Sequence, residues 1–358
     1  MSNLIGNRFR VLVFGQSHAP SIGAVIEGLP AGFAPNWDAV SAFMARRAPG
    51  GSALSTARRE ADAPEILSGL NERGETCGAP LAMRIVNGDA RSRDYEKLRD
   101  VPRPGHADYP AGVKVAGHND IRGGGQFSGR LTAPLCFAGA LAMQLLAREG
   151  VRVRAHIAQI EDVFDAPMDF AKPNLDAIAA DGLPVVDSAA GARMERAILQ
   201  AKAEGDSVGG VIECFAAGLP AGLGEPMFDG VENRLARALW GIPAVRGVEF
   251  GAGFAAAGMR GSAHNDAYRV EDGRVVTQTN RHGGILGGIT TGMPIIVRAA
   301  IKPTPSIAKT QESVSLSRNE NETLTVDGRH DPCIVPRAVP CVEAVVAMAL
   351  YDLLLERS

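Results

Sequence analysis

The sequence predicts a single unit of the α/β (α+β) class that spans residues 1–358 and contains an internal duplication. The chain has 358 residues with 46% hydrophobic and 22% charged side chains, as expected for a globular protein with a large core. Strand-like apolar runs alternate with helical patterns along the chain. No low-complexity segment or hinge-like linker interrupts them, so we expect one domain.

The duplication is visible in two apolar runs, residues 22–33 and 208–223, which both contain Gly-Leu-Pro-Ala-Gly. Each run indicates a strand stopped by a turn, and each precedes an expected helix, at 37–48 and 228–240. A second echo pairs residues 76–84 with 290–298 if Thr76 aligns with Thr290. The same order in both halves favours a diverged duplication over a solenoid, because there are only two copies. A chance match of Gly and Pro is the alternative.

The clearest helix is expected at residues 132–149, where nearly every residue is a helix former and Gly150 follows as a stop. Another helix is expected at 339–356. A helix that is apolar on most faces should be buried against sheets or a subunit partner. No window approaches the ~20 apolar residues of a membrane span. Residues 1–15 lack the long apolar stretch of a signal peptide.

The net charge limits the kinds of partner that we expect, and the cysteines indicate the redox state of the protein's surroundings. The net charge of −3 gives no reason to expect nucleic acid or a membrane surface as a partner. The five cysteines include no Cys-x-x-Cys pair, which predicts reduced thiols in a cytoplasmic protein. We interpret each cysteine as a small buried apolar side chain and predict no metal site.

Four polar, glycine-rich or basic segments stand out: residues 14–20, 103–109, 122–130 and 328–332. Further cations and hydroxyls come from Arg46, Arg47, Arg58, Arg59 and residues 302–306. Arginine forks bind phosphate and carboxylate, successive glycines let backbone N–H groups approach an anion, and histidines act as acids near neutral pH. This set predicts a site for an anionic, phosphorylated ligand. Neither a P-loop nor a Gly-x-Gly-x-x-Gly fingerprint is present, so ATP and Rossmann-type NAD sites are not indicated.

Each segment alone also has a structural interpretation. A Ser-His pair after a strand usually closes a turn, three glycines usually form a loop, and Arg-Arg usually lies on a solvated helix face. Gly15-x-Ser17-x-Ala19 is a near match to the Gly-x-Ser-x-Gly turn of serine hydrolases, but the last glycine is missing. A non-catalytic or low-activity flavin- or phosphosugar-binding protein is a second alternative. The presence of all the segments on one chain favours a catalytic site.

Together the motifs resemble the chorismate synthase family over essentially the whole chain. The family's Arg-Pro-Gly-His-Ala-Asp-Tyr is reproduced at 103–109, and its opening strand with Gly-Glu-Ser-His-Gly looks like the sequence through residues 15–19. Further family motifs occur in the same order at residues 205–210, 222–229, 283–289, 302–307 and 328–340. This set in this order is highly specific.

The chain departs from the family pattern at several positions. Gln16 and Ala19 stand where the family usually has Glu and Gly. The family's Gly-Gly-Gly-Arg-Ser-Ser-Ala-Arg is replaced at 123–130 by a version with Phe-Ser-Gly-Arg, which is similar to one branch of the family. A basic residue common after the Arg-Arg pair is lost at 51–53. Both key histidines and the aspartate remain in place.

The resemblance implies a β-α-β sandwich with an internal pseudo-two-fold duplication, a homotetramer and FMN in its reduced form, FMNH2, as cofactor. The implied reaction is an anti-1,4-elimination that converts 5-enolpyruvylshikimate 3-phosphate to chorismate, the last common step of the shikimate pathway. Phosphate leaves carbon 3 and a proton leaves carbon 6, while the flavin is not consumed. Some members reduce their flavin with NADPH. We expect this chain to depend on an external flavin reductant, because its sequence indicates no reductase domain.

The resemblance also implies roles for individual residues. His106 would protonate the leaving phosphate, His18 would protonate the flavin near N1, and Asp331 would help flavin N5 act as the base. The residues implied to hold the substrate are Ser17, Arg47, Arg103 and Arg130. The positions that match FMN-lining residues are Arg47, Gln126, Phe127, Ser128, Gly287, Lys302, Pro303, Thr304, Pro305, Ser306 and Arg329. His330 is either structural support or functional, and His118 and His264 are expected in turns.

Overall fold

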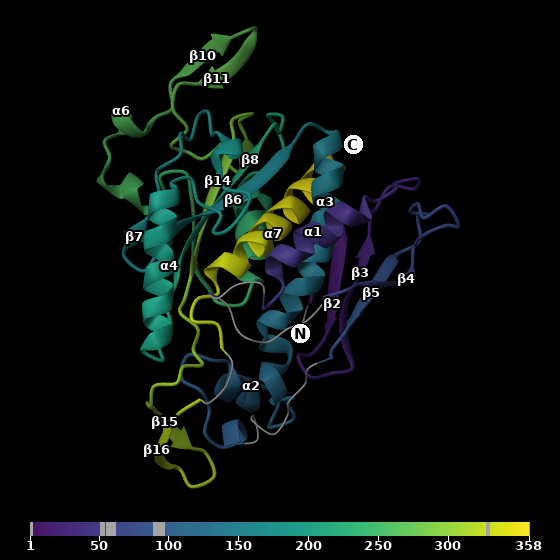
Figure 1. Cartoon of the computed structure of the whole chain (residues 1–358). Helices are drawn as coiled ribbons and strands as arrows, with labels where there is room; N and C mark the ends of the chain where they lie inside the picture. Colours follow the sequence, from purple (N-terminus) through teal and green to yellow (C-terminus); the bar gives the residue numbers. More distant parts are fainter. Residues whose placement is uncertain (1–2, 51–53, 55–61, 89–96, 327–329, 358) are drawn as a thin grey trace.

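Two five-stranded antiparallel sheets enclose a layer of helices in this computed structural model, which describes residues 3–50, 54, 62–88, 97–326 and 330–357 (Figure 1). The first sheet has the order β1 (Leu4–Ile5), β2 (Arg10–Gly15), β3 (Ser21–Glu27), β5 (Leu81–Val86), β4 (Glu65–Ser68). The second has the order β7 (Val163–Phe164), β6 (Arg152–Ile160), β8 (Gly210–Ala217), β14 (Ile295–Ile301), β9 (Val245–Phe250). The predicted β-α-β sandwich is therefore confirmed.

The helical layer consists of α1 (Trp37–Arg47), α3 (Thr132–Arg148), α5 (Val231–Trp240) and α7 (Val335–Glu356) (Figure 1). The other helices are α2 (Asp108–Lys114), α4 (Ser188–Ala203) beside β6 and β7, and the short α6 (Gly261–His264). Three hairpins extend from the sandwich: β10–β11 (Tyr268–Glu271, Arg274–Thr277), β12–β13 (Ile285–Leu286, Ile289–Thr290) and β15–β16 (Gln311–Ser315, Glu320–Leu324). One continuous cluster of buried side chains joins both sheets to the helical layer.

The central helices α3 and α7 pack directly against each other. Gly139 makes this possible, because a Cβ at that position would overlap Ala344 on the facing helix. The prediction that no segment approaches a membrane span is wrong by length and composition: Gly129–Arg148 and Val335–Glu356 have mean hydropathies of 1.4 and 1.9. However, 78% and 89% of these windows are buried inside the protein, so the two helices form the core layer of the sandwich.

Helix α7 starts at Val335, four residues before the predicted start at Val339. Pro336 lies in the first turn, where a proline N–H is not needed and its fixed φ suits a helix. Pro340 lies inside the helix and removes one backbone donor. The other predicted helices are confirmed within three residues at each end. Of the five cysteines, Cys77 is exposed, contrary to prediction, and the other four are buried.

The duplication is confirmed by the strand order, because β2-β3-β5-β4 in the first sheet is repeated as β6-β8-β14-β9 in the second. The similarity between the two halves also includes individual hydrogen bonds. Thr76 Oγ1 accepts from Phe33 N at 3.0 Å and donates to Pro30 O, while Thr290 Oγ1 accepts from Leu223 N at 2.9 Å and donates to Pro220 O. Thr76 and Thr290 therefore occupy equivalent positions in the two halves, as the sequence alignment predicts.

Candidate active site

A cavity of about 580 Å³ lies where α3 and α7 begin. Three of the four segments singled out in the sequence line it; Ser17 and His18 of the fourth are not among the described lining residues but lie against Gly123, which lines it. The predicted site residues that line it are Arg47, Arg103, His106, Gln126, Phe127, Ser128, Arg130, Lys302, Thr304, Pro305, Ser306 and Asp331, and His330 lines it as well. Five Arg or Lys side chains and one carboxylate, Asp331, lie among the described lining residues, so the cavity suits a polyanion.

Two helix N-termini contribute to this charge. Thr132, the first residue of α3, and Ile334, the N-cap of α7, both line the cavity. The N-terminus of a helix carries unpaired N–H groups and the positive end of the helix dipole, which favour a bound anion.

His106 is held by the carboxylate of Asp108. Its Nδ1 lies 2.5 Å from Asp108 Oδ1, so Nδ1 carries the proton and Nε2 is left for chemistry. The same carboxylate accepts from Arg103 Nε at 2.7 Å and Nη2 at 2.8 Å. Burial raises the pKa of Asp108, but hydrogen bonds from Arg103 and His106 outweigh burial and hold that pKa well below its usual range. Asp108 therefore stays ionised and fixes both side chains.

The glycine triplet brings the two predicted acids to one loop. Gly123, Gly124 and Gly125 have φ values of 61°, 81° and 56°, which side chains rarely adopt. A Cβ at Gly123 would lie 2.8 Å from His18 Nε2, and a Cβ at Gly124 would lie 3.1 Å from His106 Nε2. Glycine is thus required here for close approach as well as for conformation.

Ser17 and His18 follow β2 directly, as predicted, and both side chains are buried. Ser17 N donates to Gly125 O at 3.1 Å, which ties this turn to the glycine loop. The Ser17 Oγ is buried and has no hydrogen-bond partner among the described residues. An unpaired buried hydroxyl is costly in a finished structure, so this atom is available to a ligand.

The two departures in the first motif shape the turn around these residues. Ala19 N donates to Gln16 O at 3.1 Å, and the amide of Asn87 donates to Gln16 O and Ala19 O. Ala19 is not among the residues with positive φ, so alanine is unstrained where the family uses glycine.

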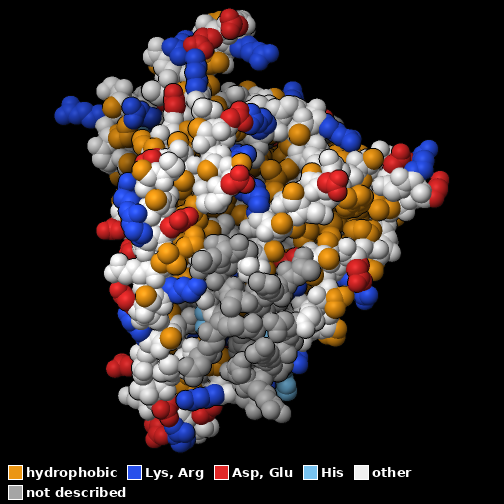
Figure 2. All heavy atoms as spheres, in the orientation of Figure 1, with side chains coloured by type: hydrophobic (Ala, Val, Ile, Leu, Met, Phe, Trp, Pro, Cys, Tyr) orange, Lys and Arg blue, Asp and Glu red, His pale blue; other side chains and the backbone are white. Residues whose placement is uncertain are grey.

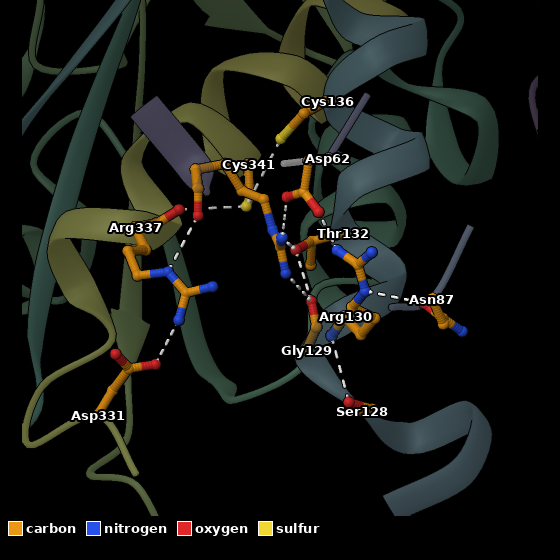
Figure 3. A network of polar contacts seen from close by, with 11 residues as sticks. Asp62, Asn87, Ser128, Gly129, Arg130, Thr132, Cys136, Asp331, Arg337 and Cys341 are labelled. Carbon is orange, nitrogen blue, oxygen red and sulfur yellow. Dashed lines mark hydrogen bonds and ion pairs between the residues drawn. The ribbon is translucent and has the colours of Figure 1, made fainter. Parts of the chain in front are cut away.

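Arg47 and Arg130 share one buried carboxylate, Asp62 (Figure 3). Arg47 Nη1 lies 2.5 Å from Asp62 Oδ2, and Arg130 Nη1 pairs with the other oxygen. Burial raises the pKa of Asp62, but the two guanidinium groups outweigh burial and lower it. Arg47 also donates to Thr132 Oγ1 at 3.1 Å. Asp62 therefore fixes two predicted substrate ligands in the cavity wall.

Asp331 lies four residues before α7 and pairs with Arg337, whose Nε donates to Arg47 O at 3.0 Å (Figure 3). Burial and neighbouring Arg47 lower the pKa of Arg337. His330 lies beside Asp331; burial and the charge of Arg103 lower its pKa, and its Nε2 makes no hydrogen bond within the described part of the chain. Its side chain therefore contributes a neutral, unsatisfied nitrogen to the cavity wall.

Residues 302–306 form a separate segment that contacts the loop that carries His106. Ser306 Oγ accepts from Arg103 Nη1 at 3.1 Å, and Lys302 Nζ donates to Gly105 O. Burial and the charge of Arg246 lower the pKa of Lys302. Thr304 Oγ1 is buried and lacks a partner in the described ranges. This segment thus contributes two groups to the cavity wall: the Lys302 cation and the Thr304 hydroxyl, which has no partner among the described residues.

Two predicted cofactor residues, Gly287 and Pro303, are described and do not line the cavity. Gly287 lies in the β12–β13 turn, and Pro303 packs against Gly209 without lining the cavity. Arg329 lies outside the described residues, as do Arg58, Arg59 and 51–53. No group of three His, Cys, Asp or Glu side chains that could hold a metal occurs in the described part of the chain.

Sequence reasoning missed Asp62, Asp108, Arg337 and Cys341. Asp108 and Arg337 lie inside motifs that were recognised, and the two-residue spacing of Asp108 from His106 was a usable signal. The sequence around Asp62 did not indicate its role in the site, because its partners Arg47 and Arg130 are 15 and 68 residues away in the chain. Trp240 to Ala244 also line the cavity without any polar motif.

The duplicated sandwich and its cation-lined cavity with two histidines define an enzyme that acts on a small anionic molecule. A profile of the family described as "Chorismate synthase" matches residues 9–355. The "Chorismate synthase" of Korarchaeum cryptofilum is 49% identical over 98% of this chain and 96% of its own length, and that of Thermococcus kodakarensis is 47% identical over 96% and 95%. A solved structure titled "Crystal Structure of Chorismate Synthase" superposes with a TM-score of 0.77 at 28% identity, covering 98% of this chain and 93% of that chain. The chain belongs to the chorismate synthase family.

Proposed function

We propose that this cavity eliminates phosphate from 5-enolpyruvylshikimate 3-phosphate to give chorismate, so that the chain acts as a carbon–oxygen lyase. The observation that carries the proposal is the placement of His106 in a cation-lined cavity, with buried His18 against the same glycine loop. An anti-1,4-elimination develops charge in two places, and two separate proton donors meet that need.

His106 is suited to the departing phosphate. Its Nδ1–H is held by Asp108, so protonated Nε2 would deliver a proton to a phosphate oxygen. Arg103, on the same carboxylate, also lines the cavity, and its positive charge would hold the phosphate. The Asp108 carboxylate would orient the ring before and after the proton transfer.

Arg47 and Arg130 would bind the carboxylates of the substrate. Asp62 accepts from one nitrogen of each guanidinium, which limits their motion and holds both cations at the cavity wall. The two fixed cations at one wall, with Arg103 and His106 at the other, would align the ring between them.

The residues present fit reduced FMN as cofactor. The cavity holds an excess of cations for its phosphate, and Ser17 Oγ, Thr304 Oγ1 and His330 Nε2 are buried polar atoms that lack partners in the described structure. When bound, reduced FMN supplies electron density to the substrate as phosphate departs. Gln126 to Ser128, Lys302 and Thr304 to Ser306 would hold it; His18 would move a proton at Nε2, and Asp331, fixed by Arg337, would orient the cofactor.

A homotetramer is the proposed assembly. Large apolar side chains are exposed at several points, with Met227 80%, Phe228 85%, Phe254 88% and Val270 72% exposed. The β10–β11 hairpin that carries Val270 protrudes from the sandwich and also bears Lys/Arg and Asp/Glu side chains, as Figure 2 shows. Exposed apolar groups of this size mark interaction surfaces. Light scattering coupled to size exclusion should give four times the chain mass of 37.5 kDa. An external flavin reductant and a cytoplasmic location stay predictions.

One assay tests the proposed activity. The protein is incubated without oxygen with substrate and with FMN reduced by dithionite, and chorismate and phosphate are measured. Equal amounts of both products are expected, and omission of either FMN or the reductant should abolish them. Saturable FMN binding that tightens with substrate, but without product, would instead favour the non-catalytic alternative. No saturable change in flavin absorbance would contradict the cofactor assignment.

A further inference from the structure

Two cysteines from different halves of the duplicated fold meet beside the cavity. Cys136 lies on α3 and Cys341 on α7, and their Sγ atoms are 3.8 Å apart (Figure 3). Both side chains are buried, at 0% and 3% exposed. They are 205 positions apart in the chain, so only the packing of the two helices brings them together.

The close approach is built into the helix pair. Gly139 and Ala344, each three residues further along its helix than the cysteine, are in contact at the point where a larger residue would not fit. Positions three apart lie on the same helix face. The contact that brings α3 and α7 together therefore also sets the sulfur separation.

The two sulfurs have unequal surroundings. Cys341 lines the cavity, whereas Cys136 is not among the described lining residues. The hydrogen bond from the Cys136 thiol lowers the pKa of Cys341, burial opposes this, and Arg47 and Thr132 lower it further. Burial and the neighbouring Cys341 raise the pKa of Cys136. Thiolates are the reactive form of cysteine, and a nearby cation favours them.

We propose that Cys341 and Cys136 form a peroxide-reactive dithiol at the cavity wall, in which Cys341 is the attacking sulfur and Cys136 the resolving sulfur. This inference does not rest on the proposed function, because it requires only a small peroxide, the cavity and the two thiols.

The chemistry balances with hydrogen peroxide as the oxidant. The Cys341 thiolate attacks one peroxide oxygen, the O–O bond breaks, and the other oxygen takes a proton and leaves as water. The Cys136 sulfur then displaces the hydroxyl of the Cys341 sulfenic acid, which leaves with the Cys136 proton as a second water. Two thiols and one peroxide thus give one disulfide and two waters, and the two electrons lost by sulfur reduce the peroxide.

Oxidation would change the cavity. A disulfide requires the sulfurs to approach to about 2.05 Å, which draws Cys341 Sγ toward α3. Arg47, one of the cations that line the cavity, interacts electrostatically with both cysteines. The binding of anions is therefore expected to differ between the two redox states.

The first test uses the full chain with Cys77→Ser, because exposed Cys77 would otherwise react with the reagents. The protein is treated with hydrogen peroxide, remaining thiols are alkylated in denaturant, and a digest made without reductant is analysed by mass spectrometry. We expect one linked peptide pair that contains Cys136 and Cys341 and is two hydrogens lighter than the free peptides, with Cys214 and Cys333 alkylated. Full alkylation of Cys136 and Cys341, under conditions that oxidise a small-molecule dithiol, would overturn the proposal.

The order of attack is tested with single variants. Cys136→Ser should accumulate Cys341 sulfenic acid that dimedone traps, Cys341→Ser should leave Cys136 unreacted, and the matched control Cys214→Ser should form the link as before. Oxidation of Cys136 in the Cys341→Ser protein would contradict the assigned order. Inorganic phosphate at four times its Kd leaves one fifth of the cavities free and should slow oxidation about fivefold. An unchanged rate at that occupancy would overturn the cavity as the route of the peroxide.

Discussion

His106 Nδ1 lies 2.5 Å from Asp108 Oδ1, and the same carboxylate receives two hydrogen bonds from the Arg103 side chain. One acid thus orients both the proposed proton donor and its neighbouring cation. Asp108→Asn keeps the shape but replaces one accepting oxygen with an NH2 group, which cannot accept from His106 or Arg103. We expect kcat to fall on the order of 10-fold, less than the loss from removal of His106 itself.

A double-mutant comparison distinguishes this positioning role from a merely structural one. If Asp108 acts through His106, Asp108→Asn should lower kcat in the wild type but have little further effect in the His106→Ala background. An equal loss of kcat in both backgrounds would show that Asp108 does not act through His106. Asp176→Asn, which changes an exposed carboxylate that does not line the cavity, serves as the control.

His106 and His18 are expected to act as separate acids. His106→Ala and His18→Ala should each lower kcat by roughly 10²- to 10⁴-fold, the usual contribution of a positioned acid. FMN and substrate should still bind, because the Arg and Lys side chains that line the cavity remain. Stopped-flow measurement of kcat and titration of both ligands check this. Near-normal kcat, or failure only through lost binding or folding, would rule out the acid role for that residue.

Asp62 should be critical for stability. In Asp62→Asn, the buried guanidinium groups of Arg47 and Arg130 lose their shared counter-charge. Breaking a buried ion pair in this way costs about 3–5 kcal/mol, and urea unfolding measures it. The control is Asp176→Asn, whose pair with Arg152 is solvent-exposed at 75% and 58%. Its change should be much smaller, because water screens this exposed pair, and similar values for the two variants would contradict the predicted difference.

His156 predicts a pH-dependent contribution to stability. It is buried between Asp165, 2.8 Å from Nδ1, and Glu213, 3.1 Å from Nε2, with Arg298 near Glu213. Burial lowers the pKa of His156, but the two carboxylates outweigh burial and raise it above 6.5. A raised pKa means that the stabilisation is complete below the unfolded value of about 6.5 and is lost as pH rises through the folded value.

The measurement compares the wild type with His156→Gln by urea unfolding between pH 5 and 9. The difference in unfolding free energy should be largest at the acid end of this range and shrink as pH rises. A difference that grows with pH would show that His156 is buried in its neutral form. Unfolding should remain two-state in both proteins for the comparison to apply.

Gln16 and Ala19 are expected to be tolerated. Ala19 has a negative φ, and both residues serve the turn through backbone atoms that Asn87 contacts. The double change Gln16→Glu and Ala19→Gly, which restores the family pattern, should therefore alter kcat by less than about threefold. A gain from near zero to robust turnover would show instead that these substitutions impair the chain.

Local turn chemistry explains why the duplication could be predicted from the sequence. Each Gly-Leu-Pro-Ala-Gly turn is held by one threonine, Thr76 or Thr290, through the same set of hydrogen bonds. Such turns are encoded by residues that need particular φ values, so the pattern survives divergence of the strands around it. The glycine triplet and the Arg103–Tyr109 motif could also be recognised in the sequence, because a few consecutive residues contain their chemistry.

Tertiary structure alone decided which distant residues complete the site. Asp62 joins Arg47 and Arg130, and Cys136 meets Cys341, through contacts whose partners are far apart in the chain. The same packing buried two helices whose composition would fit a membrane. Contacts between residues far apart in the chain depend on how complementary faces of helices and sheets pack. The residues next to a side chain in the sequence therefore do not indicate which distant residue it will contact. The sequence by itself therefore determined the chemistry available to the cavity, while packing of the two halves decided which charges are paired there.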